Sequence, residues 1–334
     1  MWLNYGVDDR DSLVFIEEVP SGKTSVKCPY CKSALTAKKG RIKEHHFAHT
    51  QETCRFVASR NSREIPVLPL YDNFNLQLSA HEFERLKELW SQYGALAYSI
   101  PNQLVLPSFV YRRLLQENPY RPPSAGYEFT NLGKIPFGAL SLMLFNQVQE
   151  PLLLEKLEEL EQKTERAQLA KLSTLPERLT DLRIYRAQLK KILSTTLYYL
   201  EVQADEQTFY KIGVTQRSIE QRVAEVQSDL KKHFKAVSIE VLGTWEHRGN
   251  VEKYFKHRYQ DFNHPIGRLT EYYKFNAEDA EIVLRDLRRM KLKEISQLET
   301  NILDGKPSPI ERQFSRKFPA DLEKTVRSGL VKLP

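Results

Sequence analysis

Cysteine and histidine residues near the N-terminus have the spacing of a metal site. Cys28 and Cys31 form a C-x-x-C pair, and a tight turn of this kind can present two sulfurs to one ion. The chain has 3 cysteines, too few for a paired disulfide framework. We predict a closed structural zinc site bound by Cys28, Cys31, His49 and Cys54, with His46 as the alternative nitrogen ligand. A buried cysteine pair beside surface histidines is the other interpretation.

A second group of chemically active side chains lies in the C-terminal half, in residues 197–222. Two apolar and aromatic runs flank the polar segment ADEQT, which predicts a β-hairpin. A helix should follow, because Ser218 and Gln221 have the spacing of a capping box. That helix carries Arg222 on its second turn. Such an arrangement can hold a tyrosine and an arginine against one phosphate group.

This hairpin and helix resemble the core of the GIY-YIG nuclease superfamily, in the variant whose second motif reads K-I-G. The first motif reads T-L-Y here and ends at Tyr198, and the second runs from Lys211 to Gly213. Threonine therefore replaces the glycine of the first motif, and lysine replaces the second tyrosine. The resemblance implies hydrolysis of phosphodiester bonds with one divalent cation, Mg²⁺ or Mn²⁺.

The resemblance also implies roles for individual side chains. Tyr198 would orient or deprotonate the attacking water, with its pKa lowered by the metal and by Arg222. Lys211 would clamp the phosphate, or serve as a base only if its pKa were strongly depressed. Tyr210 beside it would face the other side of the strand, so that only one of the two enters the site. Arg222 would bind the scissile phosphate, and Glu252 would bind the metal.

Further residues complete this candidate site. Gly213 would leave space beside the backbone for the substrate, and His257 and Glu271 match positions of the K-I-G variant that contact the substrate or the catalytic groups. A later helix carries Arg285, Arg288 and Arg289 on one side, a pattern typical of phosphate binding along a strand. A solvated helix face explains these three arginines equally well.

The cysteine-rich segment resembles the N-terminal zinc region of CoiA-like competence proteins, in which a C-x-x-C pair precedes an H-F-x-H element. That element is His46-Phe47-Ala48-His49 here. The resemblance covers about 40 residues and implies DNA handling.

The distribution of charge favours the same region as the nucleic-acid contact. The formal net charge is +7, and residues 23–63 contain ten Lys or Arg against two Glu. Residues 197–290 contain fifteen of each sign. The concentration of positive charge in one small module favours a polyanionic partner, although a solvated basic face is the alternative.

Length and composition predict a multidomain α+β protein. Its parts would be a zinc-binding basic module (1–65) with a knuckle or ribbon, a mixed scaffold (66–150), a helical linker (151–194), a GIY-YIG-like small antiparallel sheet with helices (195–290), and a basic, proline-containing tail (291–334). The linker helices could instead pair two copies in a homodimer. The N-terminus does not look like a signal peptide, and no apolar run approaches membrane-spanning length, so we expect a cytoplasmic protein without membrane contact.

These observations predict a Mg²⁺-dependent endonuclease that acts on DNA, with the zinc module aiding binding. The first alternative is a catalytically inactive nucleic-acid-binding protein that retains the fold. The second is an interaction scaffold, in which the zinc module and helices serve protein partners.

Overall fold

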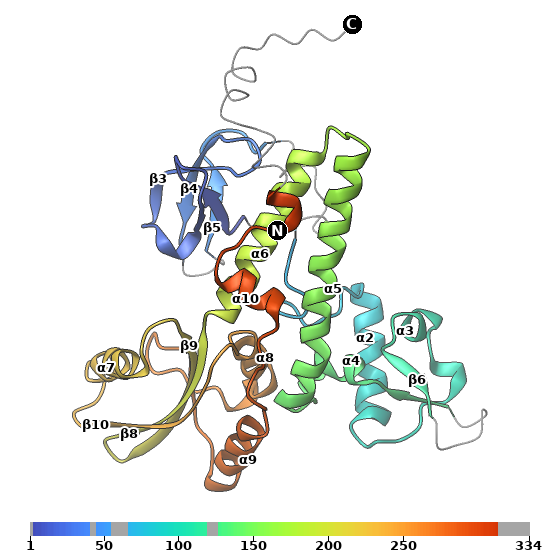
Figure 1. Cartoon of the computed structure of the whole chain (residues 1–334). Helices are drawn as coiled ribbons and strands as arrows, with labels where there is room; N and C mark the ends of the chain where they lie inside the picture. The colour runs from blue at the N-terminus through green and yellow to red at the C-terminus, as the bar shows by residue number, and fades with distance from the viewer. Residues whose placement is uncertain (1–2, 41–44, 55–65, 119–125, 313–334) are drawn as a thin grey trace, which may run out of the picture. The chain divides into compact units, whose positions relative to one another are not determined.

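The chain folds into an α+β, multidomain structure, as predicted. The computed structural model describes residues 3–40, 45–54, 66–118 and 126–312 (Figure 1). Two compact units are present, and neither is continuous in sequence. The first consists of residues 1–68, 155–190 and 296–334, and the second of residues 69–154 and 191–295.

The first unit contains a five-stranded antiparallel sheet of order β2-β1-β3-β4-β5. Its strands are β1 (Tyr5–Val7), β2 (Leu13–Phe15), β3 (Gly22–Lys27), β4 (Ala34–Lys38) and β5 (His46–His49), with a short 3₁₀ turn at Ile16–Glu18. Exposed and covered residues alternate along β3 and β4, as expected when one sheet face is buried. Val26, Leu35 and Phe47 form the core under this face.

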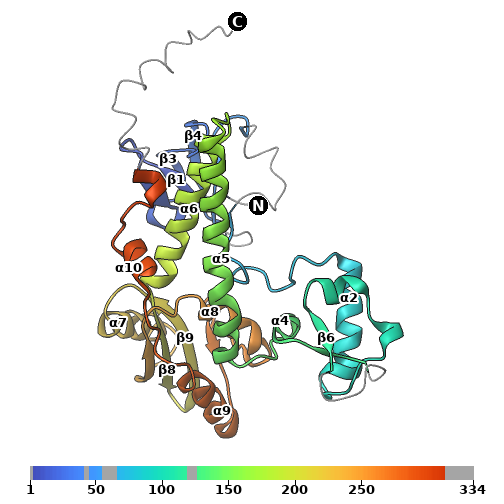
Figure 2. The same cartoon turned by 45° about the vertical axis from the view of Figure 1, so that its right-hand side comes forward.

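The first unit also contains parts of two long helices, which run antiparallel to each other. Helix α5 (Leu142–Leu169) continues through Pro151, so it begins before residue 151, where the helical linker was predicted to start. Helix α6 (Leu175–Leu193) has Pro176 in its first turn, where a missing N–H removes no helical hydrogen bond. Figure 2 shows the two helices side by side. The face of α5 that carries Leu157, Leu160, Thr164 and Ala167 is buried within this single chain.

The C-terminal tail begins with regular structure rather than loose chain. Helix α10 (Gln297–Leu303) has a capping box between Ser296 and Glu299. Beyond the helix, the Arg186 guanidinium on α6 donates a hydrogen bond of 2.6 Å to the carbonyl oxygen of Lys306. The tail therefore packs on the first unit as far as the described residues extend.

The second unit is built on a four-stranded antiparallel sheet of order β10-β8-β9-β11. The predicted hairpin consists of β8 (Thr196–Ala204) and β9 (Gln207–Thr215), and β10 (Val237–Trp245) and β11 (Tyr272–Tyr273) flank it. Asp205 opens the hairpin turn with φ of 52°. Its carboxylate accepts hydrogen bonds from the backbone N–H groups of Lys235 (3.1 Å) and Ala236 (2.9 Å), which fixes the start of β10.

Helices cover both faces of this sheet (Figure 1). Helix α7 (Ile219–Leu230) packs on the face that contains Tyr198, whereas α8 (Val251–Arg258), α9 (Ala277–Arg288) and the start of α5 pack on the face that contains Tyr199. A 3₁₀ turn at Gln260–Phe262 follows α8. Asp286 of α9 connects the helices on the Tyr199 face. Its carboxylate accepts hydrogen bonds from the backbone N–H of Leu142 (3.0 Å) and the hydroxyl of Tyr259 (2.8 Å).

A smaller group of elements precedes α5 and has its own apolar core around Leu86, Phe109 and Phe129. It comprises α2 (Ala80–Leu89), a π-helical turn (Trp90–Gly94), a 3₁₀ turn (Asn102–Leu104), α3 (Pro107–Tyr111), β6 (Leu115–Glu117), β7 (Tyr127–Phe129), α4 (Asn131–Lys134) and a 3₁₀ turn (Ile135–Phe137). Ser79 and Glu82 form a capping box at the start of α2. Among the described residues, no helix is both long and apolar enough to cross a bilayer.

Candidate functional site

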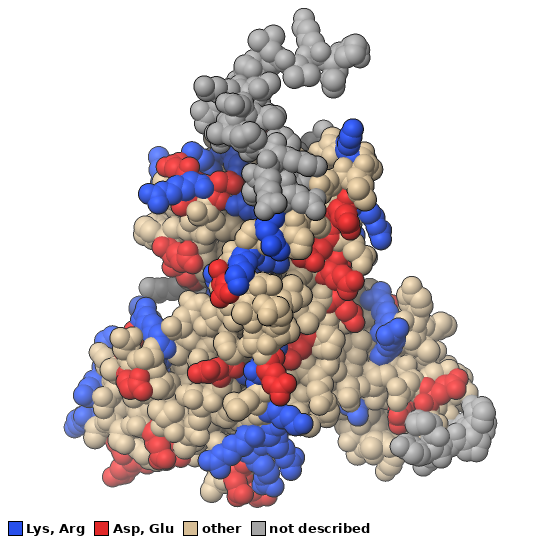
Figure 3. Space-filling model, in the orientation of Figure 1, with Lys and Arg blue, Asp and Glu red and all other residues tan. Residues whose placement is uncertain are grey.

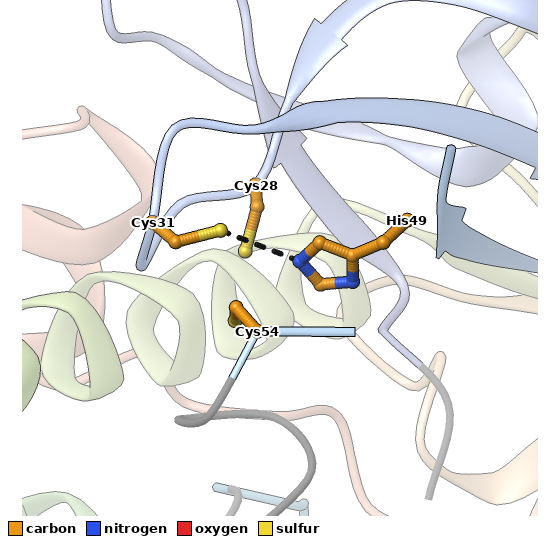
Figure 4. Close-up of side chains that lie close together, drawn as sticks. All are labelled: Cys28, Cys31, His49 and Cys54. Atoms are coloured by element: carbon orange, nitrogen blue, oxygen red, sulfur yellow. Dashed lines mark hydrogen bonds between the residues drawn. The ribbon is translucent and has the colours of Figure 1, made fainter. Parts of the chain in front are cut away.

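Four side chains of the first unit meet around one point. The sulfurs of Cys28, Cys31 and Cys54 and a ring nitrogen of His49 all lie within 4.8 Å of one another (Figure 4). Ligand atoms on a tetrahedral zinc, at about 2.0–2.3 Å from the ion, are roughly 3.3–3.8 Å apart. The Cys31 sulfur is already 3.4 Å from His49 Nε2. Small side-chain adjustments would therefore bring this donor set to the geometry of a structural zinc site.

Backbone hydrogen bonds hold the C-x-x-C turn so that both of its sulfurs lie near the other two ligand atoms. The Lys32 N–H donates to the Cys28 carbonyl (2.9 Å), and the Cys28 N–H donates to the Ser33 carbonyl (2.8 Å). Burial raises the pKa of Cys28 to about 12. Burial acts in the same direction on Cys31, but hydrogen bonds from Ser33 and His49 outweigh it and lower the pKa of that thiol to about 6. A bound divalent cation would stabilise both thiolates.

His46, the alternative nitrogen ligand, does not join the group. It lies three residues before His49 on β5, and an odd separation along a strand places two side chains on opposite faces. The His46 side chain is buried, and its residue pairs with Lys38 of β4. His49 therefore supplies the nitrogen.

The metal-binding turn is attached to helix α6 of the same unit. The hydroxyl of Tyr30, between the two cysteines, donates a hydrogen bond of 2.8 Å to the buried carboxylate of Asp181. Arg183, two residues further on, pairs with Asp11 at 2.8 Å. An ion bound at the turn would fix Tyr30 and with it the contact to α6. Sequence patterns gave no signal for Asp181.

The positive surplus of the zinc module is smaller than the window 23–63 suggests. Residues 1–65 contain eleven Lys or Arg and eight Asp or Glu, a surplus of three. Several of the acidic residues neutralise the bases directly: Lys27 pairs with Asp9, Lys32 with Asp11, and Lys39 with Glu17. Lys23 and Lys38 are exposed and carry no ion pair among the described residues.

In the second unit, the hairpin places two of the predicted side chains on one sheet face. Tyr198 of β8 is opposite Gly213 of β9, and Lys211 is opposite Leu200, so Tyr198 and Lys211 are diagonal neighbours on the face covered by α7. A Cβ atom at position 213 would lie 2.4 Å from the Tyr198 hydroxyl oxygen. The space that Gly213 provides is thus filled by the phenol, and the glycine makes room for the tyrosine rather than for the substrate.

Arg222 reaches this phenol from the second turn of α7. Its Nε donates a hydrogen bond of 3.0 Å to the Tyr198 hydroxyl, while its Nη1 pairs with Glu225 at 2.9 Å. The contact with Arg222 alone does not lower the pKa of this tyrosine. Burial raises the pKa of Tyr198, and the hydrogen bond from Arg222 only partly offsets this effect. In this structure the phenol is protonated at neutral pH.

Glu252 and Glu271 are joined to Lys211 by a chain of ion pairs. Lys211 Nζ contacts one oxygen of Glu271 at 2.9 Å, and Lys256 Nζ contacts the other at 2.6 Å. Lys256 also contacts Glu252 at 3.0 Å. We did not predict a role for Lys256, although its position four residues after Glu252 is a recognised helical pairing distance. We call Glu252, Lys256, Glu271 and Lys211 the charge chain.

The charges of this chain act on one another because all four side chains are at least partly buried. Burial lowers the pKa of Lys211, and the neighbouring Glu271 only partly restores it. Burial opposes ionisation of Glu271 as well, but the two lysines outweigh it and lower its pKa to about 2. The Tyr198 phenol also feels the negative charge of Glu271 and Glu252. The two carboxylates, the lysines and the tyrosine therefore form one electrostatic group.

Two other predicted residues lie apart from this group. Tyr210 faces the opposite side of β9, as strand alternation requires, and stacks on Tyr199 with ring centroids 5.7 Å apart. The His257 ring stacks on Phe74, and its Nε2 lies 3.0 Å from the carbonyl oxygen of Pro136. That position gives His257 a structural contact to the segment before α5.

The three arginines of α9 are exposed. Arg285 pairs loosely with Glu281 at 3.6 Å, and Arg288 and Arg289 have no ion pair among the described residues. Figure 3 shows positively charged side chains gathered at the lower edge of the view, where Figure 1 places α9. The helix therefore offers positive charge to solvent.

The metal-ligand set predicts a loss of zinc on substitution. Wild-type protein should retain about one zinc per chain after dialysis, whereas Cys31→Ser should retain well below one, because three ligands bind less tightly than four. Mass spectrometry of the metal content measures this. His45→Gln is the matched control, since His45 is partly exposed and pairs with Glu17 outside the cluster. Hydrogen exchange of residues 175–190 should rise in Cys31→Ser, and equal zinc content in both variants would contradict the assignment.

The depressed pKa of Glu271 predicts a pH-dependent stability. The carboxyl has an ordinary pKa of 4.5 in the unfolded chain and about 2 in the folded chain. Its stabilisation is therefore complete above about pH 4.5 and is lost as the pH falls towards 2. Glu271→Gln should lower the melting temperature at neutral pH, and this difference should shrink below pH 4.5. Glu240→Gln, an exposed carboxylate on β10, is the control. A difference that stays constant down to pH 3 would contradict the assignment.

Comparison with known protein families matched two separate segments. Residues 16–57 match the model described as Competence protein CoiA, N-terminal domain. Residues 195–288 match the model of the T5orf172 domain. No curated protein and no solved structure matched the chain. The N-terminal resemblance is therefore confirmed for residues 16–57, and the segment that contains Tyr198, Arg222 and the charge chain is similar to the T5orf172 domain.

Proposed function

We propose that this protein is an endonuclease of the GIY-YIG type that hydrolyses phosphodiester bonds in nucleic acid, with DNA as the substrate. The observation that carries the proposal is the contact between Tyr198 and Arg222, beside the charge chain. A phenol, a guanidinium, two ammonium groups and two carboxylates from separate elements are held together within one unit. Hydrolysis of a phosphodiester needs such groups to bind the phosphate, orient water and stabilise the leaving oxygen.

The two matched segments support a function in nucleic-acid processing. The T5orf172 domain is nuclease-like and is associated with the GIY-YIG superfamily. The N-terminal match is to a domain of a competence protein, which suits a chain that handles DNA. In this proposal residues 1–65 aid binding, 66–150 are a scaffold, 151–194 are a linker, 195–290 carry the chemistry, and 291–334 are a basic tail.

The proposed role of each side chain follows from its charge and protonation state. Arg222 binds the scissile phosphate and balances the charge that develops on it. Lys211, held by Glu271, adds a second positive charge on the same sheet face. Because burial keeps the Tyr198 phenol protonated, we assign it the role of orienting the attacking water by a hydrogen bond. Arg285, Arg288 and Arg289 extend the phosphate contacts along α9.

A divalent cation, Mg²⁺ or Mn²⁺, belongs to the proposal as a ligand of Glu252. When bound, it would neutralise charge on the phosphate and make a coordinated water more acidic. One carboxylate together with waters and substrate oxygens suits Mg²⁺. Glu252 can take this role only if the Lys256 ammonium moves away, because that group already contacts its Oε1.

The alternative is a binding protein without catalytic activity. Two observations favour it: the pKa of Tyr198 is raised rather than lowered, and the carboxylate of Glu252 is already paired. Such a protein would bind nucleic acid with a steep dependence on salt and would leave it intact in the presence of Mg²⁺ or Mn²⁺.

Two substitutions test catalysis. Arg222→Ala and Glu252→Gln should each lower the rate of plasmid nicking with Mg²⁺ at least a hundredfold, whereas nucleic-acid affinity should change by no more than a few-fold. Arg217→Ala is the matched control, because Arg217 also pairs with Glu225 but does not contact Tyr198. The assay uses plasmid, single-stranded DNA and RNA. If wild-type protein cuts none of them with Mg²⁺ or Mn²⁺, the binding alternative replaces this proposal.

The free lysines of the zinc sheet test the binding role of the first unit. Lys23 and Lys38 lie on the same face, because Lys23 is opposite Thr36 and Lys38 is two residues beyond Thr36. The double substitution Lys23→Ala with Lys38→Ala should weaken DNA binding several-fold and flatten its salt dependence by about two phosphate contacts. Lys32→Ala should have less effect, because its charge is already paired with Asp11. Equal losses in both variants would contradict a binding face on this sheet.

A further inference from the structure

The Lys256 ammonium contacts Glu252, the carboxylate that would bind the metal ion in the proposed site. Its ammonium lies 3.0 Å from Oε1 of Glu252 and 2.6 Å from Oε1 of Glu271. The second oxygen of Glu271 is engaged by Lys211. One ammonium thus bridges the only two carboxylates of the charge chain.

Burial makes this bridge stronger than an ordinary helical pair. The Glu252 side chain is 12% exposed and that of Lys256 is 33% exposed. Exposed pairs at this spacing contribute little, because water screens the charges and the side chains lose freedom. Here Lys256 has two partners, and little water reaches Glu252. The same helix carries a contrasting pair, Lys253 with Asp72, whose side chains are 39% and 43% exposed.

A divalent cation and the Lys256 ammonium would repel each other if both contacted Glu252. Two positive charges a few ångströms apart repel each other more strongly in a partly buried site than in water, because less solvent screens them. The ammonium has a second acceptor available, because it is also bonded to Glu271. It can therefore leave Glu252 without becoming unpaired.

We propose that Lys256 is a resident cation that occupies the carboxylate of Glu252 in the free protein, and that a divalent cation binds only when Lys256 shifts fully onto Glu271. This inference rests on the proposed function only in the choice of Glu252 as the metal ligand. In consequence, the free protein binds Mg²⁺ or Mn²⁺ weakly, and Lys256 sets the metal concentration at which the site fills.

Mn²⁺ binding to zinc-loaded, full-length protein tests the inference without any cleavage assay. Electron paramagnetic resonance of free Mn²⁺ gives the dissociation constant. Lys256→Met should bind Mn²⁺ about tenfold more tightly than wild type, because the competing charge is gone. Lys253→Met removes one charge from the same helix and should change the constant less than twofold. Lys256→Arg retains the charge and should remain close to wild type.

A double variant tests whether the gain in Mn²⁺ affinity requires Glu252. Adding Glu252→Gln to Lys256→Met should abolish the gain in Mn²⁺ affinity. If Lys256→Met binds Mn²⁺ no more tightly than wild type, or if the gain survives Glu252→Gln, the inference is wrong. A parallel nicking assay keeps the two proposals separate: wild-type protein that cuts nothing would overturn the nuclease, while the Mn²⁺ constants would still decide the role of Lys256.

A measurement on wild-type protein covers the case in which Lys256→Met does not fold. Lysine side chains that carry ¹³C-dimethyl labels keep their charge and give separate NMR signals. The Lys256 signal, assigned by its loss in Lys256→Arg, should shift on addition of Mg²⁺, and the Lys253 signal should not. An unchanged Lys256 signal across the Mg²⁺ titration would overturn the inference.

Discussion

The charge chain is the interaction on which the candidate site depends. Charges that leave water are stable in a protein only when partners satisfy them, and Lys211 is almost fully buried in the middle of a sheet. Glu271 satisfies it from the residue before β11, and Lys256 in turn satisfies Glu271 from α8. Removal of Glu271 would leave the buried Lys211 without its ion-pair partner. The chain therefore fixes α8 and β11 against β9 and places Glu252 on the same side as Tyr198.

The sheets of the two units are stabilised in different ways. In the second unit, a two-sided apolar core holds the sheet, and the polar site is built at one face of it. The five-stranded sheet of the first unit has a smaller apolar core. A metal ion bound by four ligand atoms, which lie near the ends of β3 and β5 and at Cys54, would add to the stability that this core provides. Metal binding contributes directly to folding in small domains of this kind. Tyr30 connects that turn to α6 through Asp181, so the metal site and the long helices form one structural element.

Charge at the surface bears on how nucleic acid would be held. Paired bases contribute less to polyanion binding than free ones, because their charge is already neutralised at short range. In the zinc module, acidic residues from before β3 pair with Lys27, Lys32 and Lys39. Among the described residues, Lys23, Lys38, Arg288 and Arg289 are exposed and have no ion pair. Binding would thus be shared between the two units rather than concentrated in the first.

The sequence by itself determined the features that depend on near neighbours. The hairpin around Asp205, the capped start of α7 at Ser218 and the C-x-x-C turn follow from local propensity and spacing. Only the tertiary structure decided between His49 and His46, because strand alternation separates them once β5 is defined. It also decided that α5 is continuous, that His257 packs on Phe74, and that Lys256 bridges Glu252 and Glu271. The contacts of His257 with Phe74 and of Lys256 with Glu271 join residues far apart in sequence, which no local pattern records.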